Sequence, residues 1–152
     1  VNKYGWVDTG SSFLPSEIIA AFLWAQIENI ENIQKKRRAH WDFYNESLAD
    51  WAHKFNIKFM NIPDYATNNA HMFYLVCKSV KQRDKLINHL KEQGVLAVFH
   101  YISLHSSKYY IEKHDGRVLP NSDMFTENLV RLPMFYELNI KNVVKKIKTY
   151  VD

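Results

Sequence analysis

The stretch from residue 15 to residue 55 constrains the fold more than any other, because its apolar residues recur at the spacing of one helical face. Pro15 suits a first helical turn, where its missing N–H costs nothing. Glu17 places negative charge at the positive end of the helix dipole. The apolar positions form two groups: Ile19, Phe22, Leu23, Ile27 and Ile30, followed by Trp41, Tyr44, Leu48, Trp51 and Phe55.

A single straight helix of this length would measure about 60 Å, which is too long for a domain of 152 residues. The polar block from Gln34 to Arg38 interrupts the apolar stripe. We therefore expect a bend, or two separate helices, near this block.

Strand and helix patterns alternate after this stretch. Residues 57–62 alternate between apolar and polar side chains and predict a strand, and residues 71–76 predict a buried strand. Residues 81–93 have helical spacing, with Gly94 following as the C-cap. Residues 95–101 are nearly all apolar, which predicts a central strand.

The last third of the chain begins with a long loop over residues 102–121. Ser122 then has a side chain suited to capping a short helix that ends near Leu129. Residues 129–132 predict a short strand, and Asn139 is expected to cap the final helix. The chain is therefore predicted to be an α/β protein, with a long N-terminal helix and a small mixed or antiparallel sheet covered by helices.

Composition narrows the class of protein. The chain is 47% hydrophobic with a formal charge of +4, which indicates a folded domain. Its basic clusters are better explained as solvated helix faces than as a nucleic-acid surface. Cys77 is the only cysteine, so no disulfide or thiolate metal site can form within one chain, and a reducing, cytoplasmic setting is expected. No apolar run is long enough for a membrane span. Because the sequence starts abruptly at Val1, we expect it to be a piece of a longer protein, with a processed or trimmed chain as the alternative.

Three groups of residues suggest binding chemistry. The loop Gly10–Ser12 precedes a helix and can present backbone N–H groups to an anion, although such a loop can also merely turn the chain. His100, Tyr101 and His105 follow the strongest strand, where side chains can hydrogen-bond a polar substrate or simply find local partners.

The N-terminal residues form the third group. Lys3, Tyr4 and Trp6 could meet a phosphate and an aromatic base. No Cys, Asp or Glu lies beside His100 and His105 in the sequence, so a metal site is not predicted. No Ser-His-Asp order, Gly-rich phosphate loop or carboxylate pair stands out either. The residues alone thus leave the function of this α/β domain open.

Four sequence runs together resemble a known family. They are KYGWVDTGSSFLPSEIIAAFLWAQIE, NAHMFYL, VFHYISLHSS and LVRLPMFYELN. They are similar to the C-terminal part of the nucleotide-sugar aminotransferases of the DegT/StrS group, over essentially the whole chain, in the same order and with similar gaps.

The resemblance implies a type I pyridoxal-phosphate (PLP) fold, in which a large cofactor-binding domain precedes a smaller C-terminal domain. Residues 1–14 would be the lead-in from the large domain, and residues 15–152 the small domain. The family works as a homodimer with active sites at the subunit interface. The lysine that forms the Schiff base would lie upstream, and no lysine here matches it. The resemblance therefore places no catalytic residue in this chain and implies that the chain alone does not transaminate.

The resemblance also assigns binding roles. Ser12 stands where many relatives have an Asn that reaches the cofactor phosphate of the partner subunit, and a hydroxyl can also donate to phosphate. His100, Tyr101 and His105 match a stretch near the sugar nucleotide. Lys3, Tyr4 and Trp6 match a Lys-Tyr-x-Trp motif, with Gly5 in place of a usual Thr, and would have a substrate or interface role.

The implied reaction moves an amino group from glutamate to C-4 of a dTDP-4-keto-6-deoxyhexose. Three alternatives remain open at this point. One is a sugar dehydratase of the same family, in which histidine replaces the lysine. Another is a basic module that binds single-stranded nucleic acid. The third is a natural stand-alone domain.

Overall fold

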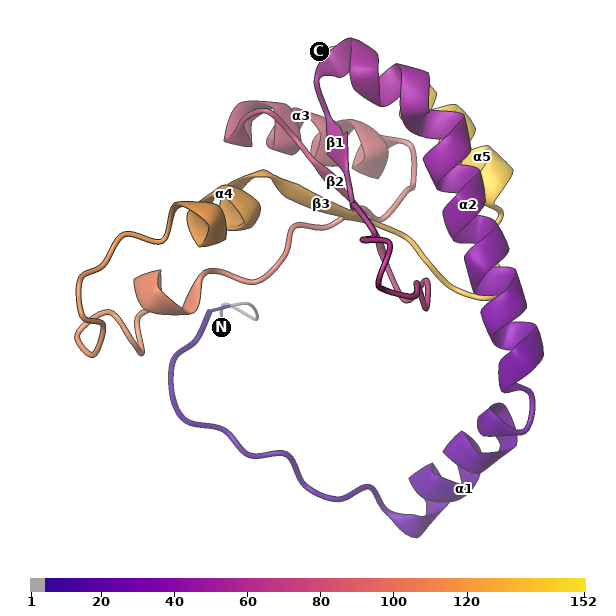
Figure 1. Cartoon of the computed structure of the whole chain (residues 1–152), viewed down its shortest axis with the longest axis horizontal. Helices are drawn as coiled ribbons and strands as arrows, with labels where there is room; N and C mark the ends of the chain where they lie inside the picture. The colour runs from indigo at the N-terminus through magenta and orange to yellow at the C-terminus, as the bar shows by residue number, and fades with distance from the viewer. Residues whose placement is uncertain (1–4) are drawn as a thin grey trace.

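The computed structural model describes residues 5–152, which form an α/β fold, as predicted (Figure 1). A long helical region leads into a small sheet, and the later helices alternate with the strands. The elements are α1 (Glu17–Ile27), α2 (Ile30–Phe55), β1 (Lys58–Phe59), β2 (Phe73–Val76), α3 (Val80–Glu92), the 3-10 turn η1 (Leu104–Ser106), α4 (Pro120–Asn128), β3 (Leu129–Leu132) and α5 (Ile140–Lys148).

The sheet is antiparallel, with strand order β1-β2-β3. Side chains alternate between its two faces along each strand. Phe73 and Leu75 of β2 lie opposite Leu132 and Val130 of β3, and these four residues are buried on one face. Tyr74 lies opposite Arg131 on the other face, which we call the second face.

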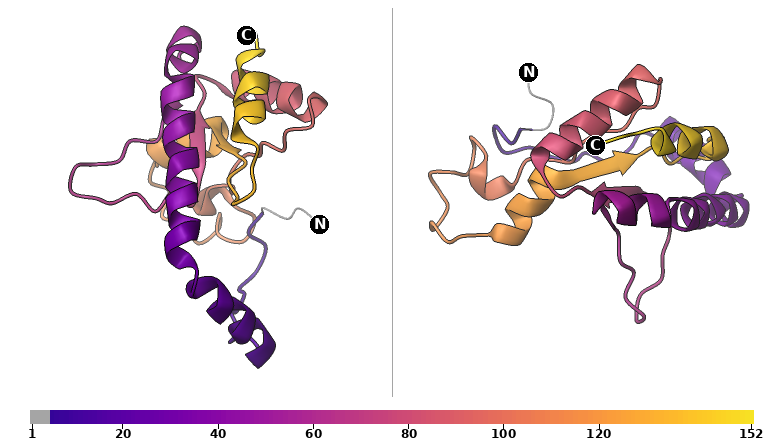
Figure 2. Two further views of the ribbon diagram at one scale, coloured as in Figure 1. Left: turned by 90° about the vertical axis from the view of Figure 1, so that its right-hand side faces the viewer. Right: turned by 90° about the horizontal axis from the view of Figure 1, so that it is seen from above.

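Three helices cover the buried face. α2 and α5 lie side by side, and α3 packs near β3 (Figure 2). The core joins the aromatic side of α2 to the apolar faces of α3 and α5. Its largest fully buried members are Tyr44, Leu48, Phe73, Leu75, Leu86, Leu90 and Ile147. This core includes the second group of the predicted helical stripe but none of the first.

The predicted interruption of the helical region exists, but its position was wrong. The helices part at Glu28 and Asn29, whereas Gln34–Arg38 continue α2 without a break. Asn29 is the N-cap of α2 with non-helical backbone angles, φ -110° and ψ 17°, and its side chain accepts a hydrogen bond from Asn32 Nδ2 at 2.7 Å. Lys, Arg and Gln are good helix formers, so the polar block changes only the exposure of α2.

The start of α1 also differs from the prediction. Ser16 is the N-cap, and its Oγ accepts from the backbone N–H of Ile19, so Pro15 lies before the helix instead of inside its first turn. Glu17 does lie in the first turn, as predicted.

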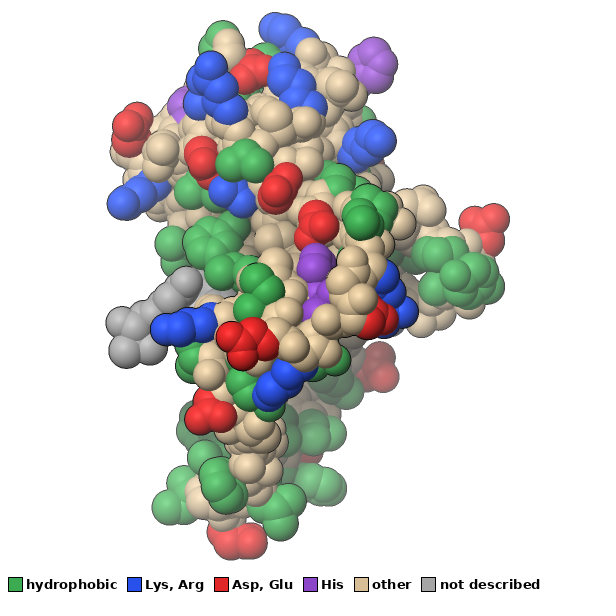
Figure 3. All heavy atoms as spheres, turned by 90° about the vertical axis from the view of Figure 1, so that its left-hand side faces the viewer, with side chains coloured by type: hydrophobic (Ala, Val, Ile, Leu, Met, Phe, Trp, Pro, Cys, Tyr) green, Lys and Arg blue, Asp and Glu red, His purple; other side chains and the backbone are tan. Residues whose placement is uncertain are grey.

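α1 has no buried residue. Phe22 is 72% exposed and Trp24 is 65% exposed. In Figure 3, hydrophobic side chains gather on the part of the molecule that projects below the body, which carries α1 and the segment before it. The apolar stripe of α1 therefore needs a covering surface that residues 5–152 do not supply.

Residues 95–101 do not form the predicted central strand. The only ladder contact of this segment is the bridge between Val98 and Arg131, at the outer edge of β3, so β2 is the central strand. The N–H of Ala97 bonds the carbonyl of Val95 at 3.1 Å, which uses backbone groups that a ladder would need. Leu96 is 77% exposed, so the apolar run is not buried on both sides.

The remaining element ends show mixed agreement with prediction. Asn139 caps α5 by accepting from Asn142 N, and Gly94 follows α3 with φ +70°, both as predicted. Ser122 is not a cap, because α4 begins at Pro120. β1 covers only two residues of the predicted 57–62.

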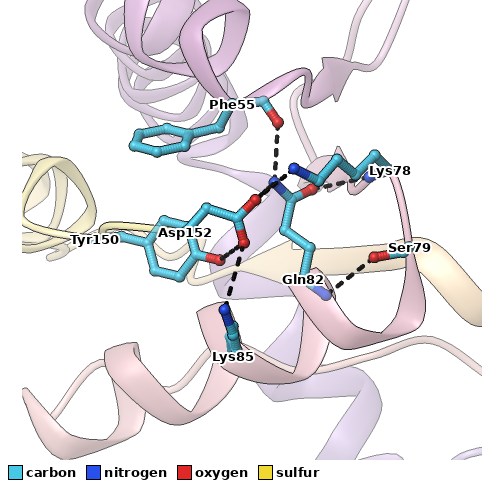
Figure 4. A network of polar contacts seen from close by, with 7 residues as sticks. All are labelled: Phe55, Lys78, Ser79, Gln82, Lys85, Tyr150 and Asp152. Atoms are coloured by element: carbon cyan, nitrogen blue, oxygen red, sulfur yellow. Dashed lines mark hydrogen bonds and ion pairs between the residues drawn. The ribbon is translucent and has the colours of Figure 1, made fainter.

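Buried Gln82 ties three parts of the fold together (Figure 4). Its Oε1 accepts from the backbone N–H of Lys78 at 2.9 Å, and its Nε2 donates to the carbonyl of Phe55 at 2.9 Å. Nε2 also donates to Asp152 at 3.2 Å, and Lys78 pairs with the same carboxylate. One amide thus joins the end of α2, the start of α3 and the end of the chain.

We expect Gln82→Ala to destabilise the fold by about 1–3 kcal/mol for each polar group left buried without a partner. Thermal and urea unfolding measured by circular dichroism would test this. Lys81→Ala, on the exposed side of the same turn, is the matched control and should change stability little. Equal stability of both variants would contradict the role of Gln82.

We also expect the isolated chain to self-associate through α1. Light scattering over a concentration series should show growing mass, and Phe22→Gln with Trp24→Gln should reduce it. Gln26→Ala, an exposed change on the same helix, should not. A monomer at high concentration would contradict this expectation.

Candidate functional site

Trp6 anchors the N-terminal segment to the segment that follows residue 100. Its indole Nε1 donates to the carbonyl of Ile102 at 2.9 Å, and its own carbonyl accepts from the N–H of Tyr109 at 3.1 Å. The Trp6 ring lies 5.7 Å from that of Tyr101, and the Tyr101 ring lies 5.4 Å from that of His100. Three predicted site residues therefore form one row, which we call the aromatic row.

His100 lies at the inner end of the aromatic row, on the second face of the sheet. It lines a hollow of about 270 Å³ together with Met72, Tyr74, Phe125 and Leu129. Its Nδ1 is buried and has no hydrogen-bond partner. Desolvation by burial, and then the positive charge of Arg131, lower the pKa of His100, so the neutral imidazole is favoured.

Arg131 is a functional candidate that the sequence predictions missed. It lies opposite Tyr74 on one side and Val98 on the other. Its Nη2 donates to the carbonyl of Phe99 at 3.3 Å, while its Nε is buried without a partner. Among residues 5–152 no carboxylate forms an ion pair with it. The signal in the sequence was a single charged residue inside the short apolar strand Leu129–Leu132.

His105 lines a different hollow from His100. Its Nε2 lies 2.8 Å from Asp123 Oδ1, and its ring lies 5.3 Å from that of His114. This hollow, of about 360 Å³, is formed by the loop after η1 and the start of α4, with Lys113 and Arg117 among its lining residues. The structure therefore separates the two histidines that the sequence places five positions apart, and gives His105 a local acidic partner.

Ser12 lies on an exposed arm between Trp6 and α1 (Figure 1). With residues 5–152 its hydroxyl makes no hydrogen bond, and nothing lies within 4 Å of a Cβ built on Gly10. The Ser12 hydroxyl is therefore exposed, and its predicted contact with a cofactor phosphate stays a prediction. Lys3 and Tyr4 lie outside the described residues, so their predicted roles stay predictions.

Residues 5–152 contain no group of three His, Cys, Asp or Glu side chains that could hold a metal ion. None of the helices described is both long and apolar enough to cross a membrane.

Solved structures of aminotransferases share this fold. Sugar aminotransferase CalS13 from Micromonospora echinospora superposes with a TM-score of 0.76 at 18% identity, covering 93% of this chain and 37% of that one. PseC from Helicobacter pylori, an aminotransferase involved in pseudoaminic acid biosynthesis, gives 0.77 at 17% identity, over 98% and 41%. Spr1654 from Streptococcus pneumoniae in its PLP form gives 0.73 at 20% identity, over 88% and 35%.

The fold is thus one found in aminotransferases whose structures include PLP and PMP forms, and the chain spans about two fifths or less of these structures. Residues 2–149 match the model of the DegT/DnrJ/EryC1/StrS aminotransferase family. The chain belongs to this family, whose cofactor is PLP, as the resemblance implied.

We expect His100 to titrate below its ordinary pKa of 6.5, because burial and Arg131 both disfavour the imidazolium. A depressed pKa in the folded state means that stability is lost as pH falls and His100 is forced to protonate. NMR titration of the His100 ring should show the low value, and Arg131→Gln should raise it. Arg38→Gln removes a distant exposed arginine and should not. A His100 pKa above 6.5 would contradict the site as described.

Proposed function

We propose that this chain is the C-terminal domain of a PLP-dependent aminotransferase that transfers an amino group from glutamate to C-4 of a dTDP-4-keto-6-deoxyhexose. The particular enzyme we propose is dTDP-4-amino-4,6-dideoxygalactose transaminase of enterobacterial-antigen and lipopolysaccharide synthesis, acting in the cytoplasm. The observation that carries the proposal is the aromatic row of Trp6, Tyr101 and His100 beside a half-buried hollow. It lies in a chain of the sugar-aminotransferase family.

The aromatic row suits a nucleotide sugar. Trp6 and Tyr101 are each 44% exposed, so their aromatic rings would contact a base or sugar ring from the protein surface. Neutral His100 can exchange a hydrogen bond with a sugar hydroxyl without adding charge to the hollow. His105, which lies 2.8 Å from Asp123 Oδ1, would contact the substrate from its own hollow. Lys3 and Tyr4 would extend the same surface.

The cofactor, when bound, supplies the electron sink for exchange of the amino group. This chain would form one wall of the active site. It would exclude water from the site and orient the sugar. The Ser12 hydroxyl would donate to the cofactor phosphate of the partner subunit of a homodimer. Residues 15–152 would form the small domain and residues 1–14 the lead-in from the large domain. The exposed stripe of α1 supports such a covering partner.

No lysine of this chain is proposed to carry the cofactor, so we propose that the chain alone is inactive. The complete protein is therefore the object to test. After borohydride reduction, peptide mass spectrometry should find a phosphopyridoxyl-lysine upstream of this segment. The complete protein should also form the 4-amino sugar from the dTDP-4-keto sugar only when glutamate is present.

Other outcomes would decide between the alternatives. Bound cofactor without any modified lysine, together with loss of a sugar hydroxyl, would favour the dehydratase. Salt-dependent retention on single-stranded RNA without cofactor would favour a binding module. Either result would overturn the aminotransferase proposal.

We expect Ser12→Ala to weaken PLP retention about 10-fold, the effect of losing one hydrogen bond to a charged group. Ser12→Asn restores a donor and should keep most of the affinity. Cofactor absorbance during dialysis of the complete protein measures both variants. If the unchanged protein, Ser12→Ala and Ser12→Asn all retained PLP equally, Ser12 would not be one of the phosphate contacts.

A further inference from the structure

A groove of about 540 Å³ lies on the second face of the sheet, next to the hollow beside His100. Strand pairing forms its floor, because Val76 of β2 lies opposite Lys58 of β1 and shares a face with Tyr74, two residues away. Tyr74 and Phe125 line both the groove and the hollow beside His100. The groove is therefore a neighbour of the candidate site and is separated from it by these two side chains.

Helix α4 forms the apolar wall of the groove. The backbone N–H of Cys77 donates to the carbonyl of Asn128 at 2.9 Å, which fixes the end of α4 beside β2. Met124 and Phe125 of α4 line the groove with exposed apolar side chains, and Val76 provides apolar surface between the strands. The volume lies within the range of about 300–1,000 Å³ that is usual for small-molecule sites. The groove can therefore hold a ring-sized apolar ligand.

The polar lining of the groove has an excess of positive charge. Lys58 and Lys78 line it, and none of the described residues that line it is Asp or Glu. Lys78 pairs with Asp152, which lies outside the lining. Lys58 forms no ion pair with any carboxylate in residues 5–152. Because a cleft lined by charge of one sign concentrates the opposite ion, this groove favours an anion.

Asn128 places an unsatisfied acceptor across the groove from Lys58. Its Oδ1 is buried and has no hydrogen-bond partner in the described part of the chain, although buried acceptors are normally paired. Asn128 directly precedes Leu129, which lies opposite Val76 on the side away from Lys58. Two strand spacings of about 4.8 Å therefore separate the Lys58 side of the groove from the Asn128 side. A ligand that carries a donor at the end away from its negative charge would match both sides.

We propose that this groove is a second binding site, for an aromatic carboxylate that carries a hydroxyl or N–H donor on its ring. The carboxylate pairs with Lys58, the ring lies over Val76 and against Met124, and the donor bonds Asn128 Oδ1. This inference goes beyond the proposed function, which assigns no ligand to the groove, and it does not depend on that function.

The test titrates the complete protein with 4-hydroxyphenylacetate by isothermal titration calorimetry. Saturable binding is expected, and Lys58→Gln should weaken it by about 3-fold, because the ion pair is at the surface. Lys91→Gln removes an exposed lysine of α3 that does not line the groove, so this matched control should bind normally. Absence of saturable binding, or equal binding by both lysine variants, would overturn the inference.

Met124 offers a sharper pair of variants. Met124→Glu places a charge of the ligand's own sign in the wall of the groove and should weaken binding by about 10-fold or more. Met124→Gln has nearly the same shape without the charge and should bind much more tightly than Met124→Glu. Glu and Gln are both good helix formers, so α4 is kept in both variants. Equal affinity of the two variants would contradict an anion in this groove.

A second ligand tests the contact with Asn128. Phenylacetate has the same ring and carboxylate but no hydroxyl, so it should bind about 5-fold more weakly than 4-hydroxyphenylacetate, as expected for one hydrogen bond. In Asn128→Leu, which removes the acceptor, the two ligands should bind alike. Equal binding of both ligands to the unchanged protein would overturn the assignment of the donor and with it the proposed ligand class.

Discussion

The antiparallel pairing of β2 with β3 is the constraint on which the rest of the structure depends. Its register commits Phe73 and Leu75 to the helices and Tyr74 and Arg131 to the second face. A slip of one residue would exchange the two sets and bury the arginine in the apolar core. The hydrophobic core and the candidate site are therefore two consequences of the same register, and neither can shift without the other.

The two faces of the sheet are covered differently. On one face, apolar side chains from α2, α3 and α5 close almost completely over the sheet. On the other, Arg131 and His100 have buried nitrogen atoms without partners in residues 5–152, as Trp41 and Trp51 also have on the core side. Unsatisfied groups cost free energy, and they persist where the surrounding fold holds them in place. The packed core supplies that support.

Local physics explains which sequence predictions succeeded. Helix periodicity, the cap at Asn139 and the glycine after α3 depend on neighbours within a few residues, so they could be predicted. The break before α2 was misplaced because the polar block Gln34–Arg38 is made of good helix formers, while the chain leaves the helical conformation at Asn29. Residues 95–101 look like a central strand, yet apolar composition alone cannot say which neighbours a strand has.

The sequence by itself determined the helices, the class of fold and the family, because each follows from spacing and motifs along the chain. It also pointed to Trp6 in one group of residues and to His100 and Tyr101 in another. Only the tertiary structure decided that these three form one row, that His105 faces another hollow, and that Arg131 stands beside His100. The physical reason is that strand pairing joins residues far apart in sequence, and no local pattern encodes the partner or the register.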